Sequence, residues 1–330
     1  MTTDEHRQNL LFGPFDPAAA GGYGEHPPRV GFFTDTSICI GCKACEVACK
    51  EWNSVPEDGL NFTAMSYDNS GGLGADTWRH VKFIEQSGRL GAQESGIERD
   101  LGLPRTEPTS TDVASRPVDL GMPGTQLPGT APDGVDGASG RTPFRWLMMS
   151  DVCKHCTHAA CLDVCPTGAL FRTEFGTVVV QEDICNGCGY CVPACPFGVI
   201  DKRESDGRVW KCTLCYDRLR VGQEPACAKA CPTKSIQFGP LEELHERAEG
   251  RVEQLRAAGI AGARLYGEDP EDGVGGMGAF FLLLDEPEVY GLPPDAVVTT
   301  RDLPQMWRMA AAAALGLAAA AVAAFAGRRP

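Results

Sequence analysis

Apolar residues recur along the chain with two different periods. Trp78 to Glu85 (WRHVKFIE) alternates between apolar and polar side chains, which is typical of a strand. Phe144 to Met149 (FRWLMM) is an apolar run that returns the chain to the core, and Ala279 to Leu284 predicts another strand. Leu241 to Ala258 has helical spacing, ends at Gly259 and is expected to pack against the core. Its apolar face is formed by Leu241, Leu244, Ala248, Val252 and Leu255.

Turn signals divide the middle of the chain into hairpins. Phe171 to Gln181 turns at Gly176, and Asp206-Gly207 is a hairpin signal before Arg208 to Trp210. Three related stretches lie in the same region and read CPTGALF, CPFGVID and CPTKSIQF. Each is a turn that leads into a short apolar strand. The chain therefore carries an internal repeat of a small unit.

Two segments show no such periodicity. Gln86 to Arg141 is rich in Gly, Pro, Ser, Thr and Asp and holds no cysteine, so we interpret it as a long surface excursion or a partly disordered insert. Met1 to Glu25 is polar and has neither an apolar stretch nor a twin-arginine pair. We expect no secretory signal in it.

The C-terminal region ends in an apolar segment. Met309 to Gly327 is nineteen residues without a charge, between Arg308 and the pair Arg328 and Arg329. A helix of this length spans about 28 Å, close to the thickness of a bilayer core. We therefore expect a transmembrane anchor over residues 306–327. Because alanine dominates the segment, an Ala-rich helix that is soluble or docks on a partner remains the alternative, and arginines on both sides leave the orientation open.

The composition is ordinary except for the number of cysteines. Hydrophobic content of 43% and 22% charged residues are ordinary for a folded protein of 330 residues. The net charge of −14 argues against nucleic-acid binding, which needs a basic face to displace counterions. Sixteen cysteines are too many for an ordinary enzyme, and their spacing is too regular for a disulfide framework. The composition therefore indicates a metal-rich protein.

The sixteen cysteines fall into four sets of four. The first and third sets have the spacing C-x2-C-x2-C-x3-C, the second has a wider middle gap, and the fourth has eleven residues in its middle. The sets are Cys39, Cys42, Cys45 and Cys49; Cys153, Cys156, Cys161 and Cys165; Cys185, Cys188, Cys191 and Cys195; and Cys212, Cys215, Cys227 and Cys231.

This spacing is typical of the 4Fe-4S ligation in bacterial ferredoxins. Two-residue gaps curl the backbone so that three thiolates converge on one cube. The fourth cysteine, which we expect to start the next helix, reaches a neighbouring cube. Pro166, Pro196 and Pro232 follow it in three sets and fix φ where the chain turns. Structural zinc would use two C-x2-C pairs or histidine, and disulfides suit short secreted chains, so both alternatives are disfavoured.

The crossover of each fourth cysteine means that the sets act in pairs. Sets two and three adjoin in sequence and pair by proximity, which leaves sets one and four to each other by elimination. Four 4Fe-4S clusters result. Cluster one has Cys39, Cys42, Cys45 and Cys231; cluster two has Cys212, Cys215, Cys227 and Cys49; cluster three has Cys153, Cys156, Cys161 and Cys195; and cluster four has Cys185, Cys188, Cys191 and Cys165.

Full thiolate ligation leaves no iron open to a substrate. We therefore predict no catalytic residue and a role in one-electron transfer. Lys43, Lys154 and Lys211 adjoin ligating cysteines, and they either raise local reduction potentials or are solvated surface lysines. His155 lies inside a C-x2-C loop, and because the thiolate set is complete we favour an outer or surface role over ligation.

These elements predict an α+β fold of tandem, duplicated ferredoxin-like 4Fe-4S modules with a single C-terminal transmembrane helix. Residues 31–85 with 205–240 form the module of sets one and four, and residues 142–204 form the module of sets two and three. The remaining segments are an N-terminal extension at 1–30, the Gly/Pro-rich insert at 86–141, a helix and C-terminal extension at 241–305, and the anchor at 306–327.

The four motifs, the helix and the terminal apolar segment together resemble the iron–sulfur (beta) subunit of membrane-bound formate dehydrogenases. The most specific stretch is KCTLCYDRLRVGQEPACAKACPTKSIQFG, Lys211 to Gly239, supported by VGG at 274–276 and EVYGLP at Glu288 to Pro293. The resemblance covers most of the chain outside Gln86–Arg141, a segment longer than the family usually shows. The first motif ends in Cys49-Lys50 rather than Cys-Pro, as it does in the family.

The resemblance implies a place in a membrane complex. Such a subunit accepts electrons from a molybdenum or tungsten pterin catalytic subunit that oxidises formate. It passes them to a membrane cytochrome b (gamma) subunit and so to quinone. The family pairs motif one with four and two with three. It also places the ferredoxin domains on the outer, periplasmic side, exported with the twin-arginine signal of the catalytic partner, although some relatives face the cytoplasm.

Other roles fit part of the pattern. The same architecture suits another molybdopterin oxidoreductase or a hydrogenase. A free polyferredoxin carrier is a different class, and the anchor and the long insert argue against it because a carrier needs neither. A redox-sensing or structural protein would not need four clusters in a relay.

Overall fold

The computed structural model describes residues 15–59, 67–68, 70–87, 144–301 and 303–326. The chain divides into two compact units, residues 1–84 with 146–330 and residues 85–145. Most of the predicted insert at 86–141, and the first half of the N-terminal extension, lie outside the described residues. The proposed module boundaries therefore stay predictions.

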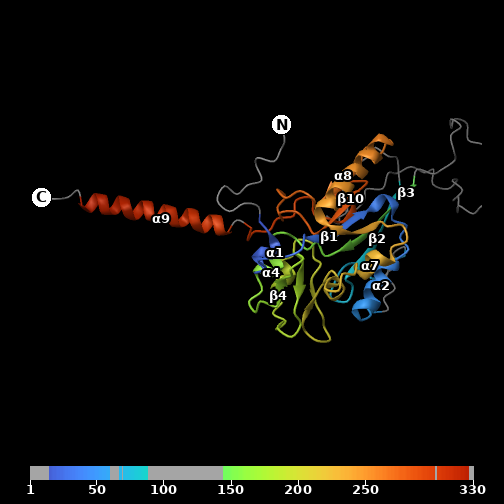
Figure 1. The fold of residues 1–330 in the computed structure, drawn as a ribbon, viewed down its shortest axis with the longest axis horizontal. Helices are drawn as coiled ribbons and strands as arrows, with labels where there is room; N and C mark the ends of the chain where they lie inside the picture. Colours follow the sequence, from blue (N-terminus) through green and yellow to red (C-terminus); the bar gives the residue numbers. More distant parts are fainter. Residues whose placement is uncertain (1–14, 60–66, 69, 88–143, 302, 327–330) are drawn as a thin grey trace, which may run out of the picture. The chain divides into compact units, whose positions relative to one another are not determined.

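A four-stranded sheet joins distant parts of the chain (Figure 1). Its order is β8 (Ile236–Pro240), β1 (Val30–Asp35), β10 (Ala279–Leu283) and β9 (Arg264–Tyr266). β1 pairs in parallel with β10 and antiparallel with β8, and β9 runs antiparallel to β10. Every residue of β10 is buried, which explains why this strand is an unbroken apolar run rather than an alternating one. The strand predicted at Ala279 to Leu284 is confirmed.

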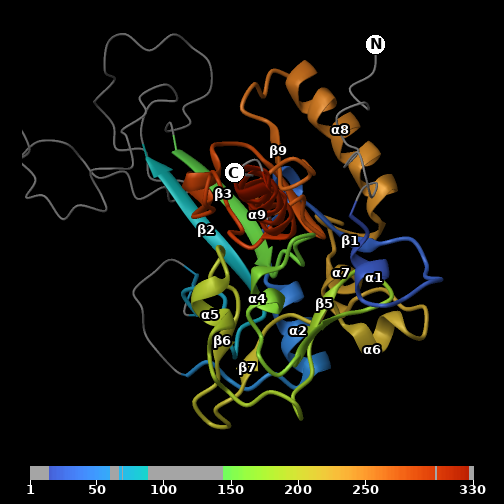
Figure 2. The ribbon, with the colours of Figure 1, turned by 90° about the vertical axis from the view of Figure 1, so that its left-hand side faces the viewer.

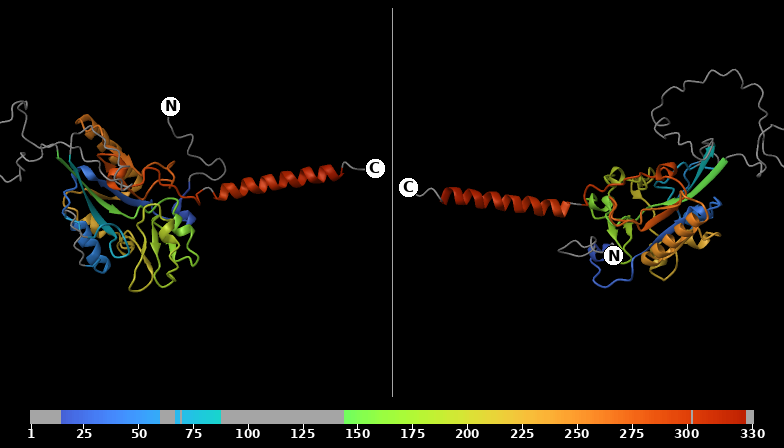
Figure 3. Two further views of the ribbon diagram at one scale, coloured as in Figure 1. Left: turned by 180° about the vertical axis from the view of Figure 1, so that it is seen from behind. Right: turned by 90° about the horizontal axis from the view of Figure 1, so that it is seen from above.

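The long helix α8 (Leu241–Ala257) directly follows β8 and packs on β1 and β8 (Figures 1 and 3). Glu242 and Glu243 in its first turn and Arg256 in its last turn have the charges that a helix dipole favours. Its buried residues are Leu241, Leu244, Ala248, Val252 and Leu255. This is the face that the sequence predicted, so its default role in the core is confirmed.

Three two-stranded sheets complete the strands (Figure 2). They are β2 (Arg79–Ser87) with β3 (Phe144–Val152), β4 (Leu170–Arg172) with β5 (Val178–Val180), and β6 (Asp201–Lys202) with β7 (Val209–Trp210). The second and third sheets are antiparallel hairpins, whose turns contain Gly176 and Gly207 with φ of +72° and +70°, as the turn signals predicted.

Each cysteine set ends at a helix. The third cysteine of each set lies in a helix, and the fourth lies in the same helix or just after its end. The expectation that the fourth cysteine starts the next helix is therefore wrong. A three-residue gap is close to one helical turn, so the third and fourth cysteines share a face one turn apart. The short helices are α1 (Pro17–Ala20), η2 (Thr36–Ile38), α2 (Ala44–Asn53), α4 (Ala160–Asp163), α5 (Cys191–Ala194), α6 (Tyr216–Leu219), α7 (Ala226–Ala230) and η4 (Pro287–Tyr290).

The last helix, α9 (Leu303–Ala326), is the apolar segment that the sequence predicted. Within the described residues it is the one helix long and apolar enough to cross a membrane. The qualifying stretch, Met306–Ala326, is 21 residues long with a mean hydropathy of 2.1 and none of it buried. Gly327, at the predicted end of the anchor, lies outside the described residues.

Candidate metal centres

Four cysteines from two different sets line one cavity. Cys153, Cys156 and Cys161 belong to the second set, and Cys195 comes from the third. Apolar side chains, among them Ile200, complete a lining that encloses about 400 Å³ of space between atoms. The structure thus brings together the four residues assigned to cluster three, including the cysteine expected to cross over.

A second cavity repeats the arrangement with sets one and four. Cys39, Cys42 and Cys45 line it together with Cys231, which lies far away in the sequence. The enclosed space is about 290 Å³. These are the residues assigned to cluster one, for which the sequence argument had only elimination.

The other two ligand sets are also neighbours in space. Cys49 lies close enough to Cys212, Cys215 and Cys227 for their charges to interact. Cys191 interacts in the same way with the other three cysteines assigned to cluster four, which are Cys165, Cys185 and Cys188. Each predicted ligand therefore lies near its predicted partners, whereas the ligation itself stays a prediction.

The cysteines surround spaces rather than converging on one point. Within the described residues, no three side chains of His, Cys, Asp or Glu come close enough together to hold a single metal ion. A polynuclear cluster needs thiolates that are spread apart, because each binds a different iron. The geometry of the donor set fits 4Fe-4S clusters.

Burial makes most of these thiols weak acids. It is the largest cause that raises the pKa of Cys161 and of Cys212 to about 12 and that of Cys45 to about 11. Neighbouring cysteines raise the pKa further in each case. Because the thiolate is the metal ligand, iron has to displace these protons, and its positive charge compensates the buried anions.

One backbone feature curls all four C-x2-C loops. The residue before the second cysteine has a left-handed conformation in every set, at φ of +63° for Gly41, +44° for His155, +69° for Gly187 and +57° for Leu214. Glycine is required at Gly187, where a Cβ atom would lie 2.1 Å from the carbonyl oxygen of Gly207. Glycine adopts this conformation readily at Gly41 and Gly187, whereas His155 and Leu214 carry no local sequence signal for it.

His155 is buried, which excludes a surface role. Its Nδ1 accepts a hydrogen bond from the amide of Val178 at 3.2 Å, so the ring proton lies on Nε2. Burial, followed by the charge of Lys211, holds its pKa well below the usual range, and the ring is neutral. Nε2 has no partner among the described protein atoms, although His155 lines the first cavity. A buried donor here fits a site whose remaining acceptors are cluster sulfurs.

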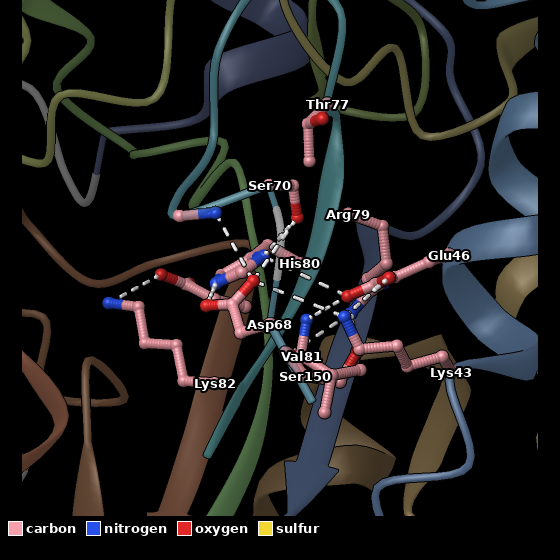
Figure 4. A network of polar contacts seen from close by, with 12 residues as sticks. Lys43, Glu46, Asp68, Ser70, Thr77, Arg79, His80, Val81, Lys82 and Ser150 are labelled. Carbon is pink, nitrogen blue, oxygen red and sulfur yellow. Dashed lines mark hydrogen bonds and ion pairs between the residues drawn. The ribbon is translucent and has the colours of Figure 1, made fainter. Parts of the chain in front are cut away.

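The three lysines have different surroundings. Lys43 is partly exposed and pairs with Glu46 at 3.4 Å, within a polar network that includes His80 (Figure 4). Lys154 and Lys211 are buried, so the surface alternative is wrong for both. Lys154 forms an ion pair with Asp151, whereas Lys211 donates to two backbone carbonyls.

Arg79 is a functional candidate that the sequence pattern did not indicate. It is buried on β2, and its Nη2 donates to Cys227 Sγ at 3.2 Å. Figure 4 shows it beside Ser150 of β3. An arginine in an alternating strand carries no signal of burial, because the cysteines that surround it come from other parts of the chain.

The fold and the cysteine sites define a ferredoxin-type iron–sulfur protein. A family model described as a 4Fe-4S dicluster domain matches residues 144–241. The predicted ferredoxin-type α+β fold with a C-terminal apolar helix is thereby confirmed, and the pairing of sites is consistent with tandem modules.

Curated relatives specify the family. The chain is 36% identical to the iron–sulfur subunit of the nitrate-inducible formate dehydrogenase of Escherichia coli (strain K12), over 84% of this chain and 76% of the relative. It is 37% identical to the formate dehydrogenase iron–sulfur subunit of Haemophilus influenzae, over 91% of this chain and 80% of that relative. Identity to the B subunit of the anaerobic dimethyl sulfoxide reductase of Escherichia coli is 30%, over 66% and 77%. The chain belongs to the family of formate dehydrogenase iron–sulfur subunits.

Proposed function

We propose that this chain is the electron-transfer subunit of a formate dehydrogenase complex and binds four 4Fe-4S clusters with the ligand sets given above. The clusters would supply a one-electron relay from a molybdenum or tungsten pterin catalytic subunit to a membrane cytochrome b subunit and so to quinone. Family membership supports the type of complex. The observation that carries the proposal is the meeting of Cys231 with Cys39, Cys42 and Cys45 around one cavity.

The exposure of the thiols suggests which sites face the partners. Of the sixteen cysteines, all of which lie in the described part of the chain, Cys42 and Cys188 are exposed. They belong to clusters one and four. Exposed Ile40 lies beside the first and exposed Tyr190 beside the second, and apolar surface of this kind is common at protein interfaces. We infer that clusters one and four are the two ends of the relay.

Electrostatic interactions between cysteines of different sites support an order for the proposed relay. Cys45 interacts electrostatically with Cys227, which links clusters one and two. Cys212 interacts with Cys153, which links clusters two and three. Cys161 interacts with Cys191, which links clusters three and four. The proposed order is therefore one, two, three, four.

We propose further that α9 anchors the subunit in the membrane. Its exposed apolar residues, among them Leu315, Leu317 and Phe325, have no protein partner in the described chain and would be solvated by lipid. By analogy with the family, we place the ferredoxin domains on the outer, periplasmic side. The alternative is the cytoplasmic face, and protease protection in membrane vesicles of known orientation distinguishes the two.

The first test is purification of the tagged chain from its native host in detergent, with metal analysis and formate-dependent dye reduction. Molybdenum or tungsten together with formate activity is the expected result. About sixteen irons per chain with no large partner and no second metal would favour a free carrier and overturn the proposal.

The ligand sets have their own test. Cys231→Ala is expected to remove the cluster held by Cys39, Cys42 and Cys45. Selective loss of the cluster held by Cys212, Cys215 and Cys227 would show that the crossover is wrong. Electron paramagnetic resonance of the reduced complex reads out both outcomes.

A second candidate function keeps the relay and changes the catalytic partner. The 30% identity to the B subunit of dimethyl sulfoxide reductase favours this candidate, because that relative belongs to an enzyme named for a substrate other than formate. A complex that contains molybdenum but does not oxidise formate would support it. Assays with a panel of oxidants and reductants then identify the substrate.

A further inference from the structure

Arg79 connects two cluster sites. Its Nη2 donates to Cys227 Sγ at 3.2 Å, and Cys227 is assigned to cluster two. Its Nη1 lies 3.3 Å from the carbonyl oxygen of Ser150 and 3.4 Å from the hydroxyl. The same hydroxyl is 3.2 Å from the Sγ of Cys45, which is assigned to cluster one. The guanidinium therefore contacts one ligand of cluster two directly and one ligand of cluster one through Ser150.

Lys211 connects the next two sites in the same way. It is 1% exposed, and its Nζ donates to the backbone carbonyls of Val178 and Cys212. It lines the same cavity as Cys153 and Cys161, both assigned to cluster three, and interacts electrostatically with both. It also interacts with the side chain of Cys212, assigned to cluster two.

Within the described ranges, neither cation lies against a carboxylate that would neutralise it. Among the residues that the structure describes, no Asp or Glu forms an ion pair with Arg79 or Lys211, whereas buried Lys154 pairs with Asp151. Nε of Arg79 also has no hydrogen-bond partner among the described residues. A buried cation without a counter-charge is strongly destabilising. The thiolates of the adjacent sites supply the negative charge that these two side chains require.

We propose that Arg79 and Lys211 are positioning residues that raise the reduction potentials of the clusters they adjoin, Arg79 for clusters one and two and Lys211 for clusters two and three. The inference rests on the proposed function. Reduction adds one negative charge to a cluster, so a cation fixed nearby stabilises the reduced form more than the oxidised form. The weak screening of a buried site strengthens this effect. Cluster two adjoins both cations, and cluster four adjoins neither.

The test is a redox titration of the detergent-purified complex, followed by electron paramagnetic resonance. The neutral variants are Arg79→Met and Lys211→Met, and the charge-keeping variants are Arg79→Lys and Lys211→Arg. Lys229→Met is the matched control, because Lys229 is an exposed lysine on α7 between two ligating cysteines. All variants are compared with the wild type. Every variant keeps Arg29 and Arg172, the other cations near cluster three.

The expected result is a pattern rather than a uniform shift. Arg79→Met lowers the potentials of clusters one and two, and Lys211→Met lowers those of clusters two and three. Cluster four moves in neither variant. Each affected cluster should show at least about a tenfold fall in its reduced-to-oxidised ratio at fixed potential, which is about 59 mV for one electron. The charge-keeping variants and Lys229→Met retain the wild-type potentials.

Several results would overturn the inference. One is unchanged potentials in the neutral variants, and another is equal shifts in neutral and charge-keeping variants. If the neutral variants do not assemble clusters, Ser150→Ala keeps Arg79 and its charge in place and removes the hydroxyl that links it to Cys45. A potential of cluster one that is unchanged in Ser150→Ala then contradicts the influence of Arg79 on cluster one through Ser150. Absence of four cluster signals in the wild type would instead contradict the proposed function.

Discussion

The sites of clusters three and four draw on the same two cysteine sets but differ in their surroundings. Cys156 of the third site is partly buried, and burial, followed by neighbouring cysteines, raises its pKa well above the usual range. In the fourth site Cys188 is exposed. The pKa of Cys165 there is lowered: slight burial acts against the shift, but hydrogen bonds from the backbone at Leu170 and from Thr167 outweigh it. Cysteine spacing thus predicts the ligand sets, whereas the surroundings determine how the charge of each cysteine is stabilised.

This difference shows two ways to hold an anionic cluster. The third site relies on fixed cations, since Lys211 and Arg172 both interact with Cys161. The fourth site relies on backbone donors and on water, which reaches its exposed cysteine. We expect the two sites to respond differently to mutation, to pH and to reagents in solution.

The largest expected effect is that of a single ligand removed from each site. Cys156→Ser removes a strong ligand at a partly buried position, where water replaces it less readily than at an exposed one, so we expect loss of cluster three and a sharp fall in soluble yield. Cys188→Ser lies where water can complete the coordination, so we expect the chain to fold and to keep clusters one to three. Iron analysis and electron paramagnetic resonance measure both. Equal loss in the two variants would show that exposure does not separate the sites.

The next effect is on the pH dependence of the chain without iron. The folded pKa of Cys161 and of Cys212 is about 12, above the value of 9.0 for an unperturbed thiol. Folding therefore favours the neutral thiols, and this stability is present below about pH 9 and lost as the pH rises toward 12. We expect the chelator-treated chain to melt progressively earlier above pH 9, and the iron-loaded chain to lack this loss. Identical pH profiles would contradict the assignment.

A smaller difference concerns chemical attack on the iron-loaded chain separated from its partners. An oxidant such as ferricyanide should remove iron from cluster four before cluster three, because only the former has an exposed ligand. Successive spectra during a slow titration give the order of loss. Simultaneous loss from both sites would show that exposure does not separate them, and the same titration of the whole complex tests whether a partner covers cluster four.

The smallest effects come from the loop backbones. Gly187→Ala places a Cβ atom 2.1 Å from the carbonyl oxygen of Gly207, whereas Gly189→Ala at φ of +77° meets nothing within 4 Å. Strain in the left-handed conformation alone costs about 1–2 kcal/mol, so Gly189→Ala should lose about that amount and Gly187→Ala clearly more. Thermal unfolding of the two variants measures the difference. His155→Gly in the third site should relieve the same strain, offset by the lost hydrogen bond to Val178.

Much of this architecture was predictable because its signals are local. The helical spacing over Leu241 to Ala258 and the turn glycines indicated the elements, and the cysteine gaps indicated sets whose members the structure brings together. The helix position of the fourth cysteines was not predictable from spacing alone, and the expectation was wrong. The burial of Arg79 and His155 was not predictable either, because it depends on segments that meet only after the chain has folded.

One consequence of the fold concerns the time at which it forms during synthesis. β1 pairs with β8 and β10, and both of these strands lie more than half the chain length after it in the sequence. Cys49 likewise lies near Cys212, Cys215 and Cys227, which are synthesised much later. At ribosomal rates, the 182 residues that follow Cys49 up to and including Cys231, the end of the last motif, take about 10–40 s to be made. During that interval the emerging first motif consists of unpartnered thiols. Loading of clusters one and two is therefore a late event, which follows translation of the segment that completes them.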